Sequence, residues 1–140
     1  MAHWLLKSEP STWSWDDQVK AGAKGTRWDG VRNHLAKKHL MAMKRGERAL
    51  FYHSGDDKEL VGVIEVIGEY RLDPGDKTAT FGMVDVKAIA PLPIPVTLAM
   101  CKAERKLAGM VLLNNSRLSV QPVTEAEWTF LCRMSGMKPD

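Results

Sequence analysis

The apolar and polar positions along the chain predict strands that alternate with helices. The run over residues 60–67 is apolar on both faces and extends toward Arg71, which is typical of a strand buried on both sides. Gly62 inside this run indicates a bend or a close approach to the backbone. The run over 81–89 alternates, which predicts one buried side and one solvent-facing side. Further strands are predicted over residues 3–7, 48–53 and 116–123.

Capping residues and the 3.6-residue period predict the helices. Ser14, with Asp17 three residues later, predicts a short capped helix that stops near Gly22. Apolar positions at helical spacing predict a helix over residues 31–43, ended by Gly46. Its buried stripe is expected to be Leu35, Ala36, Leu40 and Met43.

The segments between these elements carry turn and loop signals. Residues 22–27 are polar and predict a loop, and three alternate prolines at 91, 93 and 95 predict a stiff extended connector. Thr124 and Glu127 form a capping box for a last helix. Its core-facing residues are expected to be Trp128, Leu131 and Cys132. Trp13 and Trp15, which flank Ser14, are interpreted as core anchors.

Strands interleaved with helices predict an α+β fold, with a small curved mixed sheet or barrel flanked by helices. The length of 140 residues and a hydrophobic fraction of 44% suit one core, so a single domain over residues 1–140 is expected. The sequence contains no window of about 18 apolar residues and no basic segment before its first apolar run. We therefore expect no membrane span and no signal peptide.

Charge and cysteine content narrow the chemistry. A net charge of +3 and a pI near 8.9 weakly favour an anionic partner. Cys101 and Cys132 stand far apart without CxxC spacing, which favours a reducing, cytoplasmic location over a disulfide framework or metal site. Phosphate-loop, dinucleotide-binding, zinc and nucleophile-elbow motifs are missing from the sequence, so no cofactor and no metal are expected.

The segment 28–33 is the strongest candidate for a ligand site. Trp28 offers a flat apolar face, Asp29 offers acceptors, and Gly30 lets the backbone approach a ligand. Arg32 and Asn33 add donors beside a helix N-terminus, which favours anionic groups. A flat ligand with polar edges, such as a nucleobase, fits this set. The alternative interpretation is a core tryptophan beside a helix cap.

Other polar side chains are predicted where strands end, and these positions often carry ligand groups. The predicted pocket residues outside segment 28–33 are Lys7, Ser8, Glu9, Tyr52, His53, Ser54, Arg117 and Ser119. The alternative for each set is a strand that simply ends in solvated polar residues. Basic residues near the 31–43 helix are expected to share its outer face and to contact phosphates. They are Lys37, Lys38, Lys44 and Arg45, and the alternative is an ordinary solvated face.

Several blocks of the sequence together resemble the EVE domain family, nearly from end to end. These blocks are Lys7-Ser8-Glu9-Pro10, Trp28-Asp29-Gly30-Val31-Arg32-Asn33, Phe51-Tyr52-His53-Ser54, Val61-Gly62-Val63 and 116–123. The family includes bacterial single-domain proteins, has the PUA-like fold, and is similar to the YTH domains that read methylated adenine in RNA. The resemblance implies that Trp28 is an aromatic-cage residue, that Asp29 contacts the base edge, and that Tyr52 is a candidate second wall.

Three hypotheses follow from the residues and the resemblance. The first is a non-catalytic reader of a modified base in DNA or RNA. The second is a hydrolase acting on a modified nucleoside, either with Lys7 and Glu9 as nucleophile and general base or with Glu9 alone activating water. The third is a protein-interaction module. The acidic Glu9 and Asp29 favour a base edge that offers donors, such as an exocyclic amine.

Overall fold

A computed structural model describes residues 1–138 and gives an α+β fold. Six strands in this part of the chain form one mixed sheet in the order β2-β5-β4-β3-β1-β6. The strands are β1 (His3–Ser8), β2 (Thr26–Trp28), β3 (Arg48–His53), β4 (Glu59–Leu72), β5 (Gly82–Thr97) and β6 (Val120–Val123). The helices are α1 (Trp15–Lys20), α2 (His34–Ala42), α3 (Leu98–Lys102), α4 (Val111–Asn114) and α5 (Glu125–Ser135), with short 3₁₀ turns at Gly22–Lys24 and Arg105–Leu107.

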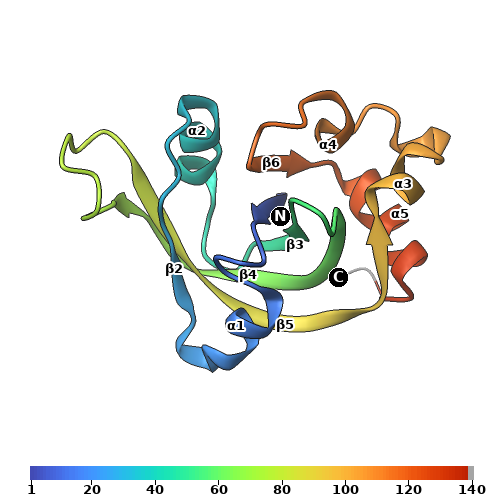
Figure 1. Cartoon of the computed structure of the whole chain (residues 1–140), viewed down its shortest axis with the longest axis horizontal. Helices are drawn as coiled ribbons and strands as arrows, with labels where there is room; N and C mark the ends of the chain where they lie inside the picture. The colour runs from blue at the N-terminus through green and yellow to red at the C-terminus, as the bar shows by residue number, and fades with distance from the viewer. Residues whose placement is uncertain (139–140) are drawn as a thin grey trace.

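The sheet carries a separate hydrophobic core on each face. One core holds α1 and α2 against the sheet through residues such as Trp15 and Leu40. The other core holds the C-terminal helices through Trp128, Leu131 and Cys132, as the periodicity predicts. In Figure 1, α3, α4 and α5 gather at one end of the molecule, and α2 lies beside the tip of the long β4–β5 hairpin at the other end.

The predicted barrel is not confirmed, because the sheet is curved but not closed. Within residues 1–138, β2 and β6 are the two edges, and no ladder joins them. Three strands lie between β2 and β1 in the sheet order, yet Trp28 of β2 packs in the same core as Leu6 of β1. The curvature therefore brings these two segments to one side of the molecule.

Local signals explain several elements. Both predicted capping boxes are present: Ser14 with Asp17 begins α1, and Thr124 with Glu127 begins α5. Gly62 is confirmed as a site of close approach, since the Trp15 indole lies directly over its Cα. None of the helices that the structure describes is long and apolar enough to cross a membrane.

Some predicted boundaries are wrong. Residues 26–28 form a strand instead of ending a loop, because their backbone pairs with β5. The proline connector is part of β5. Only 120–123 of the predicted last strand forms a strand, because 116 and 117 form a turn and 118–119 are irregular. Leu35 is 45% exposed instead of buried, since α2 begins at His34 and turns Leu35 away from the sheet.

Candidate functional site

A cavity of about 570 Å³ opens where the end of β1 meets β2. The loop after β1 and the loop after β2 complete its wall, so segments from two strands that stand three strands apart in the sheet order face one another. The lining residues are Lys7, Ser8, Glu9, Thr12, Trp13, Thr26, Arg27, Trp28, Asp29, Gly30, Val31, Arg32 and Ser119. Seven of the predicted site residues thus share one cavity: Lys7, Ser8, Glu9, Trp28, Asp29, Arg32 and Ser119.

Two tryptophans give this cavity its aromatic surface. Trp28 is 7% exposed, and its ring meets the Phe51 ring edge-on at 5.5 Å between centroids. Trp13 is half-buried, and its indole N–H donates to Oε1 of Gln18 at 2.9 Å. Sequence reasoning assigned Trp13 to the core and so missed it as a wall of the cavity. Its position follows from the turn after Pro10, where the backbone N–H of Trp13 donates to the Glu9 carbonyl.

Polar groups in the lining differ in how far they are already engaged. The Ser8 hydroxyl donates to the Trp13 carbonyl at 2.6 Å, so it helps to hold the wall. The Glu9 carboxylate accepts a long hydrogen bond from the Ser54 hydroxyl at 3.4 Å. Asp29 is exposed, and no hydrogen bond or ion pair joins its carboxylate to another residue in the described part of the chain. Asp29 is therefore free to accept hydrogen bonds from a ligand.

Lys7 lines the cavity, but its side chain is directed to the face of the sheet that carries Tyr52, opposite to the face of Phe51 and Trp28. Its Nζ donates to the Ser116 carbonyl at 2.7 Å and lies 5.6 Å from the centre of the Tyr52 ring. Burial lowers the pKa of the Lys7 ammonium. Because Lys7 pairs with Tyr52 in the parallel register of β1 and β3, both side chains lie on the same face of the sheet.

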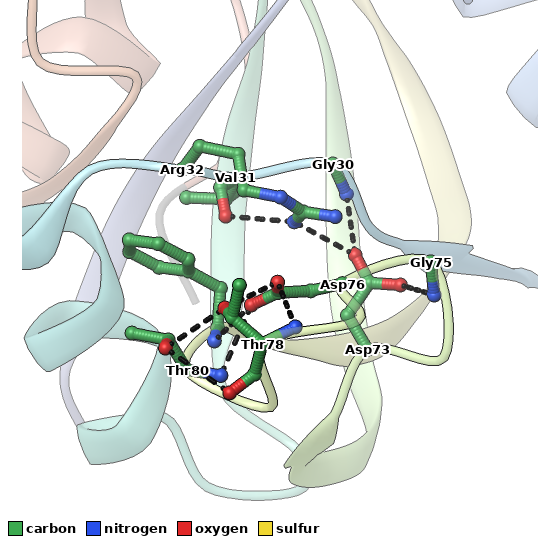
Figure 2. Close-up of polar contacts among 9 residues, drawn as sticks. Gly30, Val31, Arg32, Asp73, Gly75, Asp76, Thr78 and Thr80 are labelled. Atoms are coloured by element: carbon green, nitrogen blue, oxygen red, sulfur yellow. Dashed lines mark hydrogen bonds and ion pairs between the residues drawn. The ribbon is translucent and has the colours of Figure 1, made fainter.

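The wall that follows Asp29 is fixed by the distant residue Asp73. One carboxylate oxygen of Asp73 accepts hydrogen bonds from the Gly30 N–H at 3.0 Å and from Nη1 of Arg32 at 2.9 Å, as Figure 2 shows. These hydrogen bonds lower the pKa of Asp73, and the one from Gly30 has the largest effect. Arg32 was expected to offer its donors to a ligand, and the structure engages part of its guanidinium within the protein.

Five predicted pocket residues lie outside the cavity lining. Tyr52 is buried in the core beneath the C-terminal helices, because its neighbour Phe51 takes the cavity-side position on β3. Asn33 caps α2, its Oδ1 accepting from the Ala36 N–H at 2.9 Å. Ser54 is linked to two lining residues: its hydroxyl donates to the Glu9 carboxylate and its backbone N–H donates to the Ser8 carbonyl at 2.9 Å. The other two residues outside the lining are His53 and Arg117.

His53 supports the start of α1. Its Nε2 accepts a hydrogen bond from the backbone N–H of Trp15 at 3.0 Å. In the neutral ring the hydrogen therefore lies on Nδ1, which is 3.2 Å from a carboxylate oxygen of Asp57. Ligand atoms of His53, Asp57 and Glu59 lie within 4.8 Å of one another. A metal would need the lone pair of Nδ1, and the Trp15 hydrogen bond favours the opposite tautomer. The three residues therefore fit a helix-capping network better than a metal site.

The predicted basic face is split by the end of α2. The helix stops at Ala42, so only Lys37 and Lys38 lie on it, and Lys44 and Arg45 belong to the following turn. The expectation that the four share one helix face is therefore wrong. Lys37 lies 6.0 Å from the centre of the Phe81 ring, which places it beside the β4–β5 turn.

The curled mixed sheet and its cavity define a PUA-like α+β protein. The EVE domain model matches residues 2–134, and the chain belongs to the EVE domain family. This confirms the resemblance seen in the sequence. Human thymocyte nuclear protein 1 is 31% identical over 170 residues, which cover 99% of this chain and 76% of that protein.

Solved structures give the same result in three dimensions. The NMR structure of Rpa0253 from Rhodopseudomonas palustris is 57% identical, has a TM-score of 0.92, and covers 97% of this chain and 94% of that chain. Human THYN1, solved in complex with 5-methylcytosine-containing DNA, is 31% identical with a TM-score of 0.89 and covers 99% and 100%. The YTH domain of Zygosaccharomyces rouxii MRB1, solved with N6-methyladenosine RNA, shares the fold at 17% identity and a TM-score of 0.58, covering 96% and 86%.

Proposed function

We propose that this protein is a non-catalytic reader that takes a modified base of DNA or RNA into the cavity beside Trp28. The observation that carries the proposal is the shared cavity itself: two indole rings and the unpartnered Asp29 carboxylate line one space of about 570 Å³. That volume is within the usual range for small-molecule sites, roughly 300–1,000 Å³. The structure of human THYN1 with 5-methylcytosine DNA supports the proposal through a relative of the same family.

The chemistry of the lining matches an extruded base. Stacking on an aromatic side chain contributes roughly 1–3 kcal/mol per base. The Asp29 carboxylate accepts hydrogen bonds but donates none when ionised, so it selects a base edge that carries an N–H donor. Both 5-methylcytosine and N6-methyladenine keep such a donor on the exocyclic nitrogen. Arg27 of the lining is exposed and adds positive charge at the rim.

The basic residues outside the cavity are assigned to the phosphate backbone. Lys38, Lys44 and Arg45 are exposed, and Lys37 is half-buried beside Phe81. Charges of this kind contribute affinity without sequence preference, and their effect falls as salt rises. The cavity is then the source of selectivity and the basic residues are the source of general affinity.

Binding to matched oligonucleotides tests this function. Strands of DNA and RNA would carry cytosine, 5-methylcytosine, 5-hydroxymethylcytosine, adenine or N6-methyladenine at one position, each measured at two salt concentrations. We expect tighter binding to one modified base and loss of that preference in Trp28→Ala. Phe130→Ala is the control, because Phe130 lies on α5, away from the cavity lining. Binding that is equal for all bases and for Trp28→Ala contradicts the pocket assignment.

The hydrolase alternative rests on Lys7 and Glu9, which both line the cavity. Burial lowers the pKa of Lys7, which favours a nucleophilic amine, but Nζ donates to the Ser116 carbonyl. Mass spectrometry of acetylated and methylated nucleosides after incubation separates the two functions. A loss of mass that Glu9→Gln abolishes would establish the hydrolase, and unchanged nucleosides support the reader. An aromatic cavity that no base or nucleoside enters would favour a protein-interaction module.

A further inference from the structure

The turn between β4 and β5 reaches across to the cavity and holds part of its wall. Asp73, the first residue after β4, is 4% exposed although it carries a charge. Its carboxylate accepts hydrogen bonds from the Gly30 N–H at 3.0 Å and from Arg32 Nη1 at 2.9 Å. A carboxylate removed from water needs such partners, so the loss of either donor would be costly.

Three consecutive wall residues depend on this carboxylate. Gly30 and Arg32 donate to it directly, and the same Nη1 of Arg32 also donates to the Val31 carbonyl at 3.1 Å. Gly30 has a φ of +79°, in the left-handed region that glycine adopts easily. Glycine also adopts many other conformations, and the hydrogen bond to Asp73 favours the one observed.

The turn is itself braced, so Asp73 is a fixed anchor. Its other carboxylate oxygen accepts the Gly75 N–H at 2.7 Å, and its backbone N–H donates to the Phe81 carbonyl at 3.0 Å. Asp76 accepts the backbone N–H groups of Thr80 at 3.0 Å and Phe81 at 2.7 Å. Figure 2 shows Asp73 between Gly30 and Gly75, with Asp76, Thr78 and Thr80 beside it.

Asp29 lies between two fixed neighbours as a result. Trp28 on its N-terminal side is held by the pairing of β2 with Val84 of β5. Gly30 on its C-terminal side is held by Asp73. The Asp29 carboxylate forms no hydrogen bond or ion pair with another described residue, so the backbone on either side of Asp29 determines where its side chain starts from. A group that is already oriented loses less conformational entropy when a ligand binds.

We propose that Asp73 is a positioning residue of the base-binding cavity, which orients Asp29 by fixing Gly30, Val31 and Arg32 and thereby engages Arg32 within the protein. This role rests on the proposed function, because it assigns Asp73 to the binding of the same modified base. Asp73 itself is absent from the cavity lining, so it acts through the wall it holds.

The experiment compares wild type with Asp73→Asn in two measurements. Amide hydrogen exchange of Gly30, read by NMR, reports the wall without any ligand. Affinity for a DNA oligonucleotide with one 5-methylcytosine, and for an RNA with one N6-methyladenine, reports the site. Because a hydrogen bond to a charged group is lost, we expect the Gly30 exchange rate and the affinity each to change about tenfold. Glu65→Gln is the control, since Glu65 lies on β4 of the same hairpin and pairs with Arg48 and Lys87, none of which lines the cavity.

We expect Asp73→Asn to speed Gly30 exchange and weaken binding about tenfold, and Glu65→Gln to stay within about twofold in both. If wild type binds an oligonucleotide and Asp73→Asn leaves either readout unchanged, the positioning role is wrong. If wild type binds neither oligonucleotide but Asp73→Asn speeds Gly30 exchange, the proposed function fails and Asp73 still holds the wall. The two failures are therefore distinct.

A second variant keeps the test decisive if Asp73→Asn does not fold. Arg32→Gln removes the guanidinium and leaves the hydrogen bond between Gly30 and Asp73 possible. We expect faster Gly30 exchange together with weaker binding, because the wall loses its second tie. Weaker binding with unchanged Gly30 exchange would show that Arg32 contacts the ligand directly, and this would overturn the positioning role.

Discussion

The indole N–H of Trp13 donates to Oε1 of Gln18 at 2.9 Å, and Gln18 is fully buried. The amide nitrogen of Gln18 reaches the Val86 carbonyl of β5 at 3.4 Å. One side chain of α1 therefore links a wall of the cavity to the sheet. This link explains how Trp13 can present a fixed surface although it follows a turn and is only half-buried.

Replacement of Gln18 by leucine tests this link. Gln18→Leu removes the partner of the Trp13 indole N–H and also the buried hydrogen bond to the Val86 carbonyl. A buried group that loses its hydrogen bond costs about 1–3 kcal/mol. We expect a lower free energy of unfolding in urea and weaker binding of the preferred oligonucleotide. Val19→Ala, at an exposed position on the same helix, is the control. Wild-type affinity in Gln18→Leu would mean that Trp13 is oriented without Gln18.

The contact between Gly62 and Trp15 gives a prediction about stability alone. A Cβ at Gly62 would overlap the Trp15 ring, whereas a Cβ at Gly109 would meet no atom within 4 Å. Overpacking a core typically costs 1–3 kcal/mol, so we expect Gly62→Ala to lower the free energy of unfolding by about that amount. Gly109→Ala is expected to change it by less than about 0.5 kcal/mol. Urea titration of both variants measures the difference, and equal stability would refute the close contact.

The sequence predicts the end of β1 and the segment around Trp28 as one site, because both carry polar groups next to a strand or helix end. It cannot decide between Phe51 and Tyr52, since adjacent residues on a strand face opposite sides. The choice depends on which face of β3 carries the cavity. That face is set by the pairing of β3 with β1 and β4.

The contribution of Asp73 could not be predicted for a related reason. Asp73 and Gly30 are separated by 43 positions, and their hydrogen bond exists only once the β4–β5 hairpin is folded. In the sequence, Asp73 is part of an ordinary turn signal with Pro74 and Gly75. β2 was missed because three residues are too few for a period-2 pattern, and only the partner strand β5 defines it.

The turn carboxylates make stability depend on acid pH. Hydrogen bonds lower the pKa of Asp76 below its unfolded value of about 3.9. The bond from the Thr78 hydroxyl has the largest effect, followed by the bond from the Phe81 N–H. This carboxylate therefore stabilises the folded state fully above that value, and its contribution is lost as the pH falls through the folded pKa. We expect the urea midpoint of wild type to fall below about pH 4, and that of Asp76→Asn to fall less. Parallel curves for the two proteins would contradict this role.

Both cysteines are expected to be unreactive in the folded protein. Cys101 is fully buried and Cys132 is 2% exposed, within the core beneath the C-terminal helices. Burial raises the pKa of the Cys101 thiol to about 11, which leaves little thiolate at neutral pH. We expect an aromatic disulfide reagent to label neither thiol in native buffer and both in urea. Rapid labelling of one thiol without urea would show that the core opens locally.

The last prediction separates the basic residues by their position. For single strands, each phosphate contact contributes about 0.7 to the slope of log K against log salt concentration. If Lys37 and Lys38 on α2 both hold phosphates, Lys37→Gln with Lys38→Gln lowers that slope by about 1.4. Lys44→Gln with Arg45→Gln tests the turn after the helix in the same way. Because phosphate contacts carry no base information, both double variants should keep the preference for the modified base that Trp28→Ala loses. A slope that changes for only one pair would place the nucleic-acid strand along that segment. An unchanged slope for both pairs would assign the general affinity to other cations, with Arg27 at the cavity rim as the first candidate.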